Sequence, residues 1–73
     1  MIKEEKLAML EEVMDIDEGK LHEEDRLEDI DEWDSLSVLT LVMEMKKRFN
    51  ISLSTQQIRS FETVLDICAV IPD

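Results

Sequence analysis

The first segment of the chain has apolar residues at helical spacing. They recur mainly three or four positions apart, so that they form one stripe on a helix: Leu7, Met9, Leu10, Val13 and Met14. Charged residues fill most of the other positions: Lys3, Glu4, Glu5, Lys6, Glu11 and Glu12. The pattern predicts an amphipathic helix from Ile2 to about Met14, with these charged residues on its solvent side.

Helical spacing disappears from Asp15 to Trp33. Acidic residues are frequent in this stretch, Gly19 interrupts it, and the apolar residues are scattered: Ile16, Leu21, Leu27, Ile30 and Trp33. A loop of this length is unusual in a small domain. We therefore expect the scattered apolar side chains to hold it across the helices, with a short turn around residues 23–27.

The strongest helical pattern extends from Asp34 to Phe49. Asp34 is a good N-cap, Asn50 is a plausible C-cap, and three basic residues near the end suit the helix dipole. One face is a predicted core stripe: Val38, Leu41, Val42, Met45 and Phe49. A second apolar line lies on a different side: Leu36, Leu39 and Met43. Helical geometry alone leaves two interpretations of that line, a wide buried arc or an exposed surface for a partner.

Two shorter patterns complete the chain. Ser54 and Gln57 have the spacing of a capping box and predict a short helix ending near Phe61. A looser version at Thr63 opens a last helix whose apolar positions are Val64, Ile67, Cys68 and Ile71, with Pro72 at its end. Together the patterns predict an all-α fold with a single domain over residues 1–73. It is a small antiparallel helical bundle of three longer helices plus one short helix, with a long loop between helices one and two.

Size and charge exclude several classes of function. A chain of 73 residues buries only about 60% of its unfolded surface, which leaves little room for a deep active site, so we expect no enzyme. The net charge is −11, and residues 1–34 hold 15 acidic and 4 basic residues. Nucleic acids and anionic membranes are therefore poor partners. A single cysteine requires no oxidising compartment, and there is no signal-peptide core or membrane-length apolar run. We therefore expect a cytoplasmic protein. We also expect it to be a monomer.

Most candidates for chemistry have structural explanations. Asp15, Asp17 and Gly19 resemble part of a calcium loop, but the required frame fails, so we interpret the acidic stretch as a solvated face and expect no metal. Cys68 lies on an apolar stripe and is expected to be a small core residue. His22 has no partners that would form a catalytic arrangement and is expected on the surface.

Ser35 stands in the first turn of the strong helix, directly after its predicted cap. A serine there is usually part of the capping chemistry. The free N–H groups and the positive dipole end of the helix nevertheless favour an anionic group at this point. Ser37 is an alternative hydroxyl that lacks the preceding aspartate and lies deeper in the turn.

Several segments resemble the acyl carrier protein family, nearly throughout the chain. They are Glu32-Trp33-Asp34-Ser35-Leu36, Leu41-Val42-Met43, Phe49-Asn50-Ile51 and Phe61-Glu62-Thr63-Val64-Leu65-Asp66-Ile67. Asp-Ser-Leu alone is a weak signal, but its place at the head of the second helix, with Phe-x-x-Val downstream, makes it strong. The resemblance implies a stand-alone carrier in which Ser35, between Asp34 and Leu36, carries 4′-phosphopantetheine donated from coenzyme A by a phosphopantetheinyl transferase. The terminal thiol of that group would hold acyl cargo as thioesters.

The resemblance also implies that the second helix faces the partner enzymes. Leu36, Leu39 and Met43 would then be apolar contacts, and Lys46 and Lys47 would flank them. Fatty-acid carriers typically have acidic residues along this helix, whereas here Glu44 is its only acid after Asp34. This departure favours a specialised pathway, with an acyl- or aminoacyl-loading ligase and downstream transferases or synthases as partners. The alternatives are an aminoacyl carrier, for D-alanine or a peptide, and an unmodified helical adaptor that binds a protein through the same line.

Overall fold

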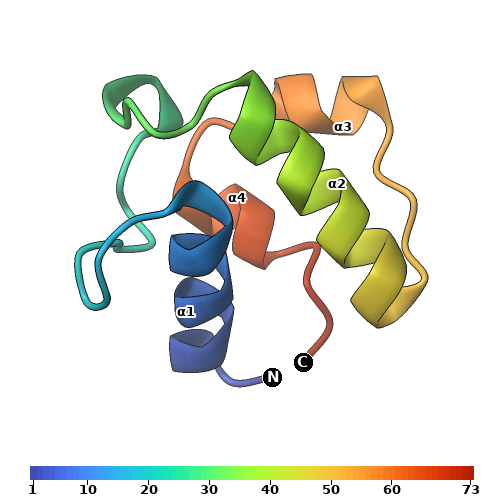
Figure 1. The fold of residues 1–73 in the computed structure, drawn as a ribbon, viewed down its shortest axis with the longest axis horizontal. Coiled ribbons are helices and arrows are strands. Elements are labelled where there is room, and N and C mark those ends of the chain that lie inside the picture. Colours follow the sequence, from blue (N-terminus) through green and yellow to red (C-terminus); the bar gives the residue numbers. More distant parts are fainter.

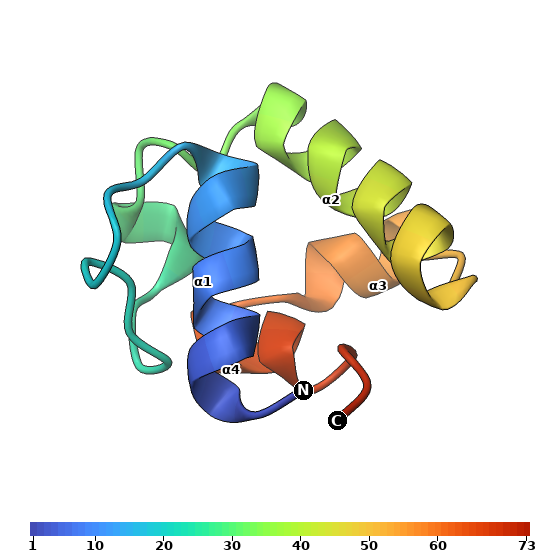
Figure 2. The same ribbon diagram turned by 60° about the horizontal axis from the view of Figure 1, so that its bottom comes forward.

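Four α-helices and one short 3₁₀ helix make up the computed structural model, which describes all 73 residues. The α-helices are α1 (Lys3–Met14), α2 (Ser35–Phe49), α3 (Thr55–Ser60) and α4 (Val64–Cys68), and the 3₁₀ helix η1 is Leu27–Asp29. In Figures 1 and 2, α1 and α4 lie side by side, α2 crosses nearby, and the two termini lie close together. This confirms the all-α bundle. No helix combines the length and the apolar character that crossing a lipid bilayer requires.

The helices α1, α2 and α4 enclose the core. Five side chains from them are almost completely inaccessible to solvent: Leu10, Leu41, Met45, Val64 and Ile67. Met9, Val13 and Met14 of α1 add to the core, as expected for an amphipathic helix that buries one face. In the predicted core stripe of α2, by contrast, Val38, Val42 and Phe49 are only half-buried. The prediction of three longer helices and one short helix was wrong for the last helix, because α4 has only five residues and the α-helices are therefore two long and two short. After Cys68 the chain forms a turn, and Ile71 is buried although it lies outside the helix.

The long loop between α1 and α2 is held in place by apolar packing against the core and by backbone hydrogen bonds. Leu21 and Leu27 are buried in the core, and Ile16, Ile30 and Trp33 pack against it, as predicted. Backbone bonds also join the loop to the start of α4, since the Leu27 N–H donates to the Glu62 carbonyl (2.9 Å) and the Val64 N–H donates to the Asp25 carbonyl (3.0 Å). The loop is therefore a packed part of the fold.

The prediction for Glu11 was wrong. Its side chain was expected on the solvent side of the first helix, but the residue is only 5% exposed. Its carboxylate accepts hydrogen bonds from the N–H groups of Gly19 (2.9 Å) and Leu21 (3.0 Å). A buried carboxylate needs such donors, and here they come from the loop. Glu11 thus fixes the first turn of the loop against α1, where Gly19 takes a positive φ of 85°.

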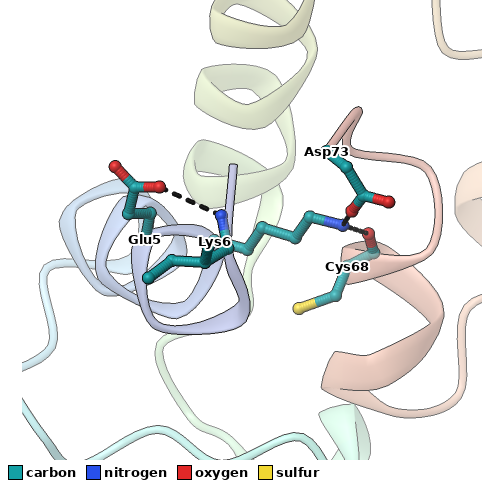
Figure 3. Close-up of polar contacts among 5 residues, drawn as sticks. Glu5, Lys6, Cys68 and Asp73 are labelled. Carbon is teal, nitrogen blue, oxygen red and sulfur yellow. Dashed lines mark hydrogen bonds and ion pairs between the residues drawn. The ribbon is translucent and has the colours of Figure 1, made fainter.

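Lys6 also departs from its expected exposed position. Figure 3 shows its side chain extending from α1 toward the C-terminal segment. The Nζ atom donates to the Asp73 carboxylate (2.7 Å) and to the Cys68 carbonyl (3.3 Å), and the side chain is only 12% exposed. These contacts join the two ends of the chain and satisfy a carbonyl at the end of α4.

Candidate modification site

The start of α2 is fixed by Asp34. This residue has an extended backbone, and its Oδ1 atom accepts a hydrogen bond from the Ser37 N–H (3.0 Å). Such a cap satisfies one of the N–H groups that a helix leaves free in its first turn. Before it, Trp33 is partly buried and packs against the core. Asp34 therefore acts as the cap that the sequence predicted.

The two serines of this turn lie in different environments. Ser37 is only 6% exposed, and its hydroxyl donates to the Glu32 carbonyl at 2.5 Å. Ser35 is exposed, and its hydroxyl makes no hydrogen bond within the molecule. Of the two, only Ser35 therefore has a hydroxyl that is both accessible and unused.

Two further donors lie beside the Ser35 hydroxyl. The backbone N–H groups of Ser35 and Leu36 have no acceptor in the molecule, whereas the Ser37 N–H is bonded to Asp34 and the Val38 N–H to the Asp34 carbonyl (2.9 Å). Free N–H groups at the positive end of a 15-residue helix favour an anionic group. The residues present thus fit a phosphodiester on Ser35.

The outer side of α2 continues from this turn as an apolar surface. Leu36, Leu39 and Met43 are 71%, 56% and 61% exposed. The opposite side of the helix is buried and carries Leu41 and Met45. Of the two interpretations of the second apolar line, the structure therefore favours the exposed one. We call Leu36, Leu39 and Met43 the apolar line.

Basic residues at the end of α2 divide into two kinds. Lys46 and Lys47 are exposed and have no ion-pair partner. Arg48 contacts Glu44 (2.8 Å) and Glu12 of α1 (3.9 Å). The helix ends at Asn50, which takes the left-handed conformation with φ 57° and supplies the predicted C-cap.

The other residues considered from the sequence offer no chemistry to this turn, although Asp15 lines a surface hollow beside it together with Asp34 and Leu36. His22 is exposed, and its backbone N–H donates to Asp25 (2.9 Å). Cys68 is buried, and desolvation raises the pKa of its thiol above the ordinary value. Asp15 and Asp17 are exposed, and no group of three or more potential ligands is arranged to hold a metal ion.

The chain matches the model of a known protein family. Residues 7–71 match the family described as "Phosphopantetheine attachment site". Neither the curated proteins nor the solved structures gave a match. Domains of this family carry a 4′-phosphopantetheine group, act as carriers, and interact with phosphopantetheinyl transferases and pathway enzymes. The match confirms the family expected from the sequence: the chain belongs to the phosphopantetheine-binding carrier proteins.

Proposed function

We propose that Ser35 is the attachment site of 4′-phosphopantetheine and that the protein carries acyl groups without catalysing a reaction itself. The observation that carries the proposal is the contrast between the two serines, because Ser35 is exposed with an unused hydroxyl while Ser37 is buried and hydrogen-bonded. The group, when bound, supplies a terminal thiol that holds cargo as a thioester. Asp34 and Leu36 flank the attachment residue, Asp34 as the helix cap and Leu36 as an exposed apolar contact for the transferase.

We further propose that the apolar line, together with Lys46 and Lys47, forms the surface on which partner enzymes dock. Exposed apolar side chains on one face of a helix are typical of interaction sites. This surface begins one residue after Ser35, so an enzyme bound there lies next to the attachment point. The loading enzyme and the downstream transferases or synthases of a fatty-acid, polyketide or other specialised pathway are the proposed partners. An aminoacyl cargo is the alternative within the same class of carrier.

The cytoplasm is the proposed location of this carrier. Its one cysteine is buried and unpaired, so the fold contains no disulfide that an oxidising compartment would have to form.

The proposal is tested by intact-mass measurement after incubation with a broad-specificity phosphopantetheinyl transferase and coenzyme A. The wild type should gain the mass of one phosphopantetheine group. Ser35→Ala should gain none while keeping its helical circular dichroism, because the Asp34 cap remains. Ser37→Ala is the matched control, and it should still be modified although it loses the hydrogen bond to Glu32. An unmodified wild type would instead favour the unmodified adaptor.

A further inference from the structure

The residue types on the exposed side of α2 change from one end of the helix to the other. Ser35 lies at the first turn, the apolar line follows, and Lys46 and Lys47 lie at the last turn. At 100° per residue the two lysines project on either side of the apolar line. With a rise of 1.5 Å per residue, the lysines lie about 17 Å along the helix from Ser35. A protein that covers the apolar line therefore meets both ammonium groups.

The charge of these lysines is not neutralised within the molecule. The chain has 19 acidic residues, yet Lys46 and Lys47 form no ion pair. Their neighbour Arg48, by contrast, is paired with carboxylates of α1 and α2. The two lysines thus form an isolated positive patch on a protein whose net charge is −11.

A shallow hollow joins the patch to the apolar line. It has a volume of about 480 Å³ and is lined by Val42, Met43, Glu44, Lys46 and Lys47. The one carboxylate in this lining, Glu44, is already paired with Arg48 (2.8 Å). The remaining apolar side chains and the two ammonium groups suit an apolar side chain that is flanked by carboxylates.

We infer that the protein docking on α2 presents apolar side chains flanked by carboxylates, which meet Lys46 and Lys47 about 17 Å from Ser35. The identification of the docking protein as a partner enzyme rests on the proposed carrier function. The exposed acids Glu32 and Asp34 lie at the serine end of the same helix, so the surface is negative at one end and positive at the other. Such a distribution selects one docking orientation and rejects partners of the opposite polarity. A second copy of this chain is a poor occupant because both copies carry a charge of −11.

The test uses the unmodified protein and a synthetic amphipathic helical peptide that has leucines on one face and glutamates beside them. Binding is followed through the backbone amide signals of the ¹⁵N-labelled protein at 0.15 M salt, where charges beyond about 8 Å are screened. The compared proteins are the wild type, Lys46→Glu/Lys47→Glu, and the control Lys20→Glu/Arg59→Glu. The control makes the same change in net charge at two exposed basic residues that are outside α2 and also have no ion-pair partner.

The inference predicts that amide shifts concentrate between Leu36 and Lys47. Affinity should fall roughly 3- to 30-fold in Lys46→Glu/Lys47→Glu, since two exposed pairs are lost, and remain within about twofold in the control. A second peptide with lysines in place of the glutamates should bind α2 of the wild type more weakly, which tests the inference without any variant.

Three results would overturn it. They are equal affinity losses in the two double variants, peptide shifts outside α2, and wild-type self-association through this face in sedimentation. Because the measurement uses the unmodified protein, it is independent of whether Ser35 accepts phosphopantetheine.

Discussion

At the residue scale, two hydroxyls in one helical turn have different chemical availability. The hydroxyl of Ser37 is buried and bonded to a backbone carbonyl, so it forms part of the structure that positions the turn. Ser35 projects into solvent, beside two backbone N–H groups that have no acceptor. Both differences follow from position in the helix, since Ser37 lies on the side that faces the core and Ser35 does not.

Cys68 leads to a prediction at the same scale. The residue is 4% exposed, and burial raises the pKa of its thiol. The unmodified native protein should therefore react slowly with a thiol reagent at neutral pH, and the reaction should become fast on unfolding in denaturant. A spectrophotometric thiol assay measures both rates. After modification by the transferase, one rapidly reacting thiol should appear, which belongs to the attached group. Rapid reaction of the unmodified native protein would contradict the burial of Cys68.

At the element scale, α2 combines a structural and a presenting role. Its inner side supplies Leu41 and Met45 to the core, and its outer side carries the apolar line. The cap at Asp34 fixes where the helix begins and therefore places Ser35 in its first turn, and the left-handed Asn50 fixes where the helix ends.

Removal of the cap should therefore destabilise the protein measurably. Asp34→Ala deletes the acceptor of the Ser37 N–H, and we expect the free energy of unfolding to fall by about 1 kcal/mol. Asp34→Asn keeps an acceptor at the same place and should retain most of the stability. Urea denaturation monitored by circular dichroism compares the variants. Equal losses in Asp34→Ala and Asp34→Asn would show that the charge, and not the capping bond, stabilises the turn.

Local signals predicted the elements well, whereas contacts distant in sequence were missed. Asp34, Asn50 and the Ser54–Gln57 capping box act within one turn, and all three were found from residue type and spacing. Glu11 was misplaced because its donors lie eight and ten residues later in an irregular loop. The one available signal was its position four residues after Leu7 and three before Met14, which puts it beside the apolar stripe.

The candidate site was predicted only in part by physical reasoning. Ser35 in a helical first turn is compatible with simple capping, and the resemblance to a family selected it. The burial of Ser37 follows from its position four residues before Leu41 on the same face of α2, whereas its hydrogen bond to the Glu32 carbonyl depends on the path of the loop and could not be read from spacing. The last helix was overestimated because Ile71 continues the apolar spacing of Val64 and Ile67 although the chain has already turned.

At the scale of the whole molecule, charge is distributed unevenly over a small fold. Residues 1–34 hold 15 of the 19 acidic residues, and few of these acids have a basic partner. The core has only 12 buried apolar residues, so repulsion among the acids opposes a modest stabilisation.

The melting temperature should consequently rise with salt. Screening shortens the range of the repulsion from about 30 Å at 0.01 M to about 8 Å at 0.15 M. Thermal melts followed by circular dichroism at these two salt concentrations test the expectation. A melting temperature that is unchanged or lower at the higher concentration would show that the acids are already compensated within the fold.

Lowering the pH should remove the contribution that the Asp66 carboxylate makes to the free energy of unfolding. Hydrogen bonds from the N–H groups of Glu62 (2.8 Å) and Thr63 (3.1 Å) lower the pKa of this carboxyl below its ordinary value of 3.8. The carboxylate therefore stabilises the fold above pH 3.8, and the contribution is lost as the pH falls through the lowered pKa. In urea denaturation, the stability difference between the wild type and Asp66→Asn should be constant near neutral pH and shrink below this value. A difference that does not change with pH would contradict the assignment.

We propose that Ser35, and no other hydroxyl of the protein, carries the phosphopantetheine group. The most direct measurement is fragmentation mass spectrometry of the wild-type protein after modification by the transferase, applied to the peptide that contains both Ser35 and Ser37. Fragments containing Ser35 should carry the added mass, and fragments containing Ser37 without Ser35 should not. Added mass on Ser37, or on a peptide that lacks Ser35, would contradict it.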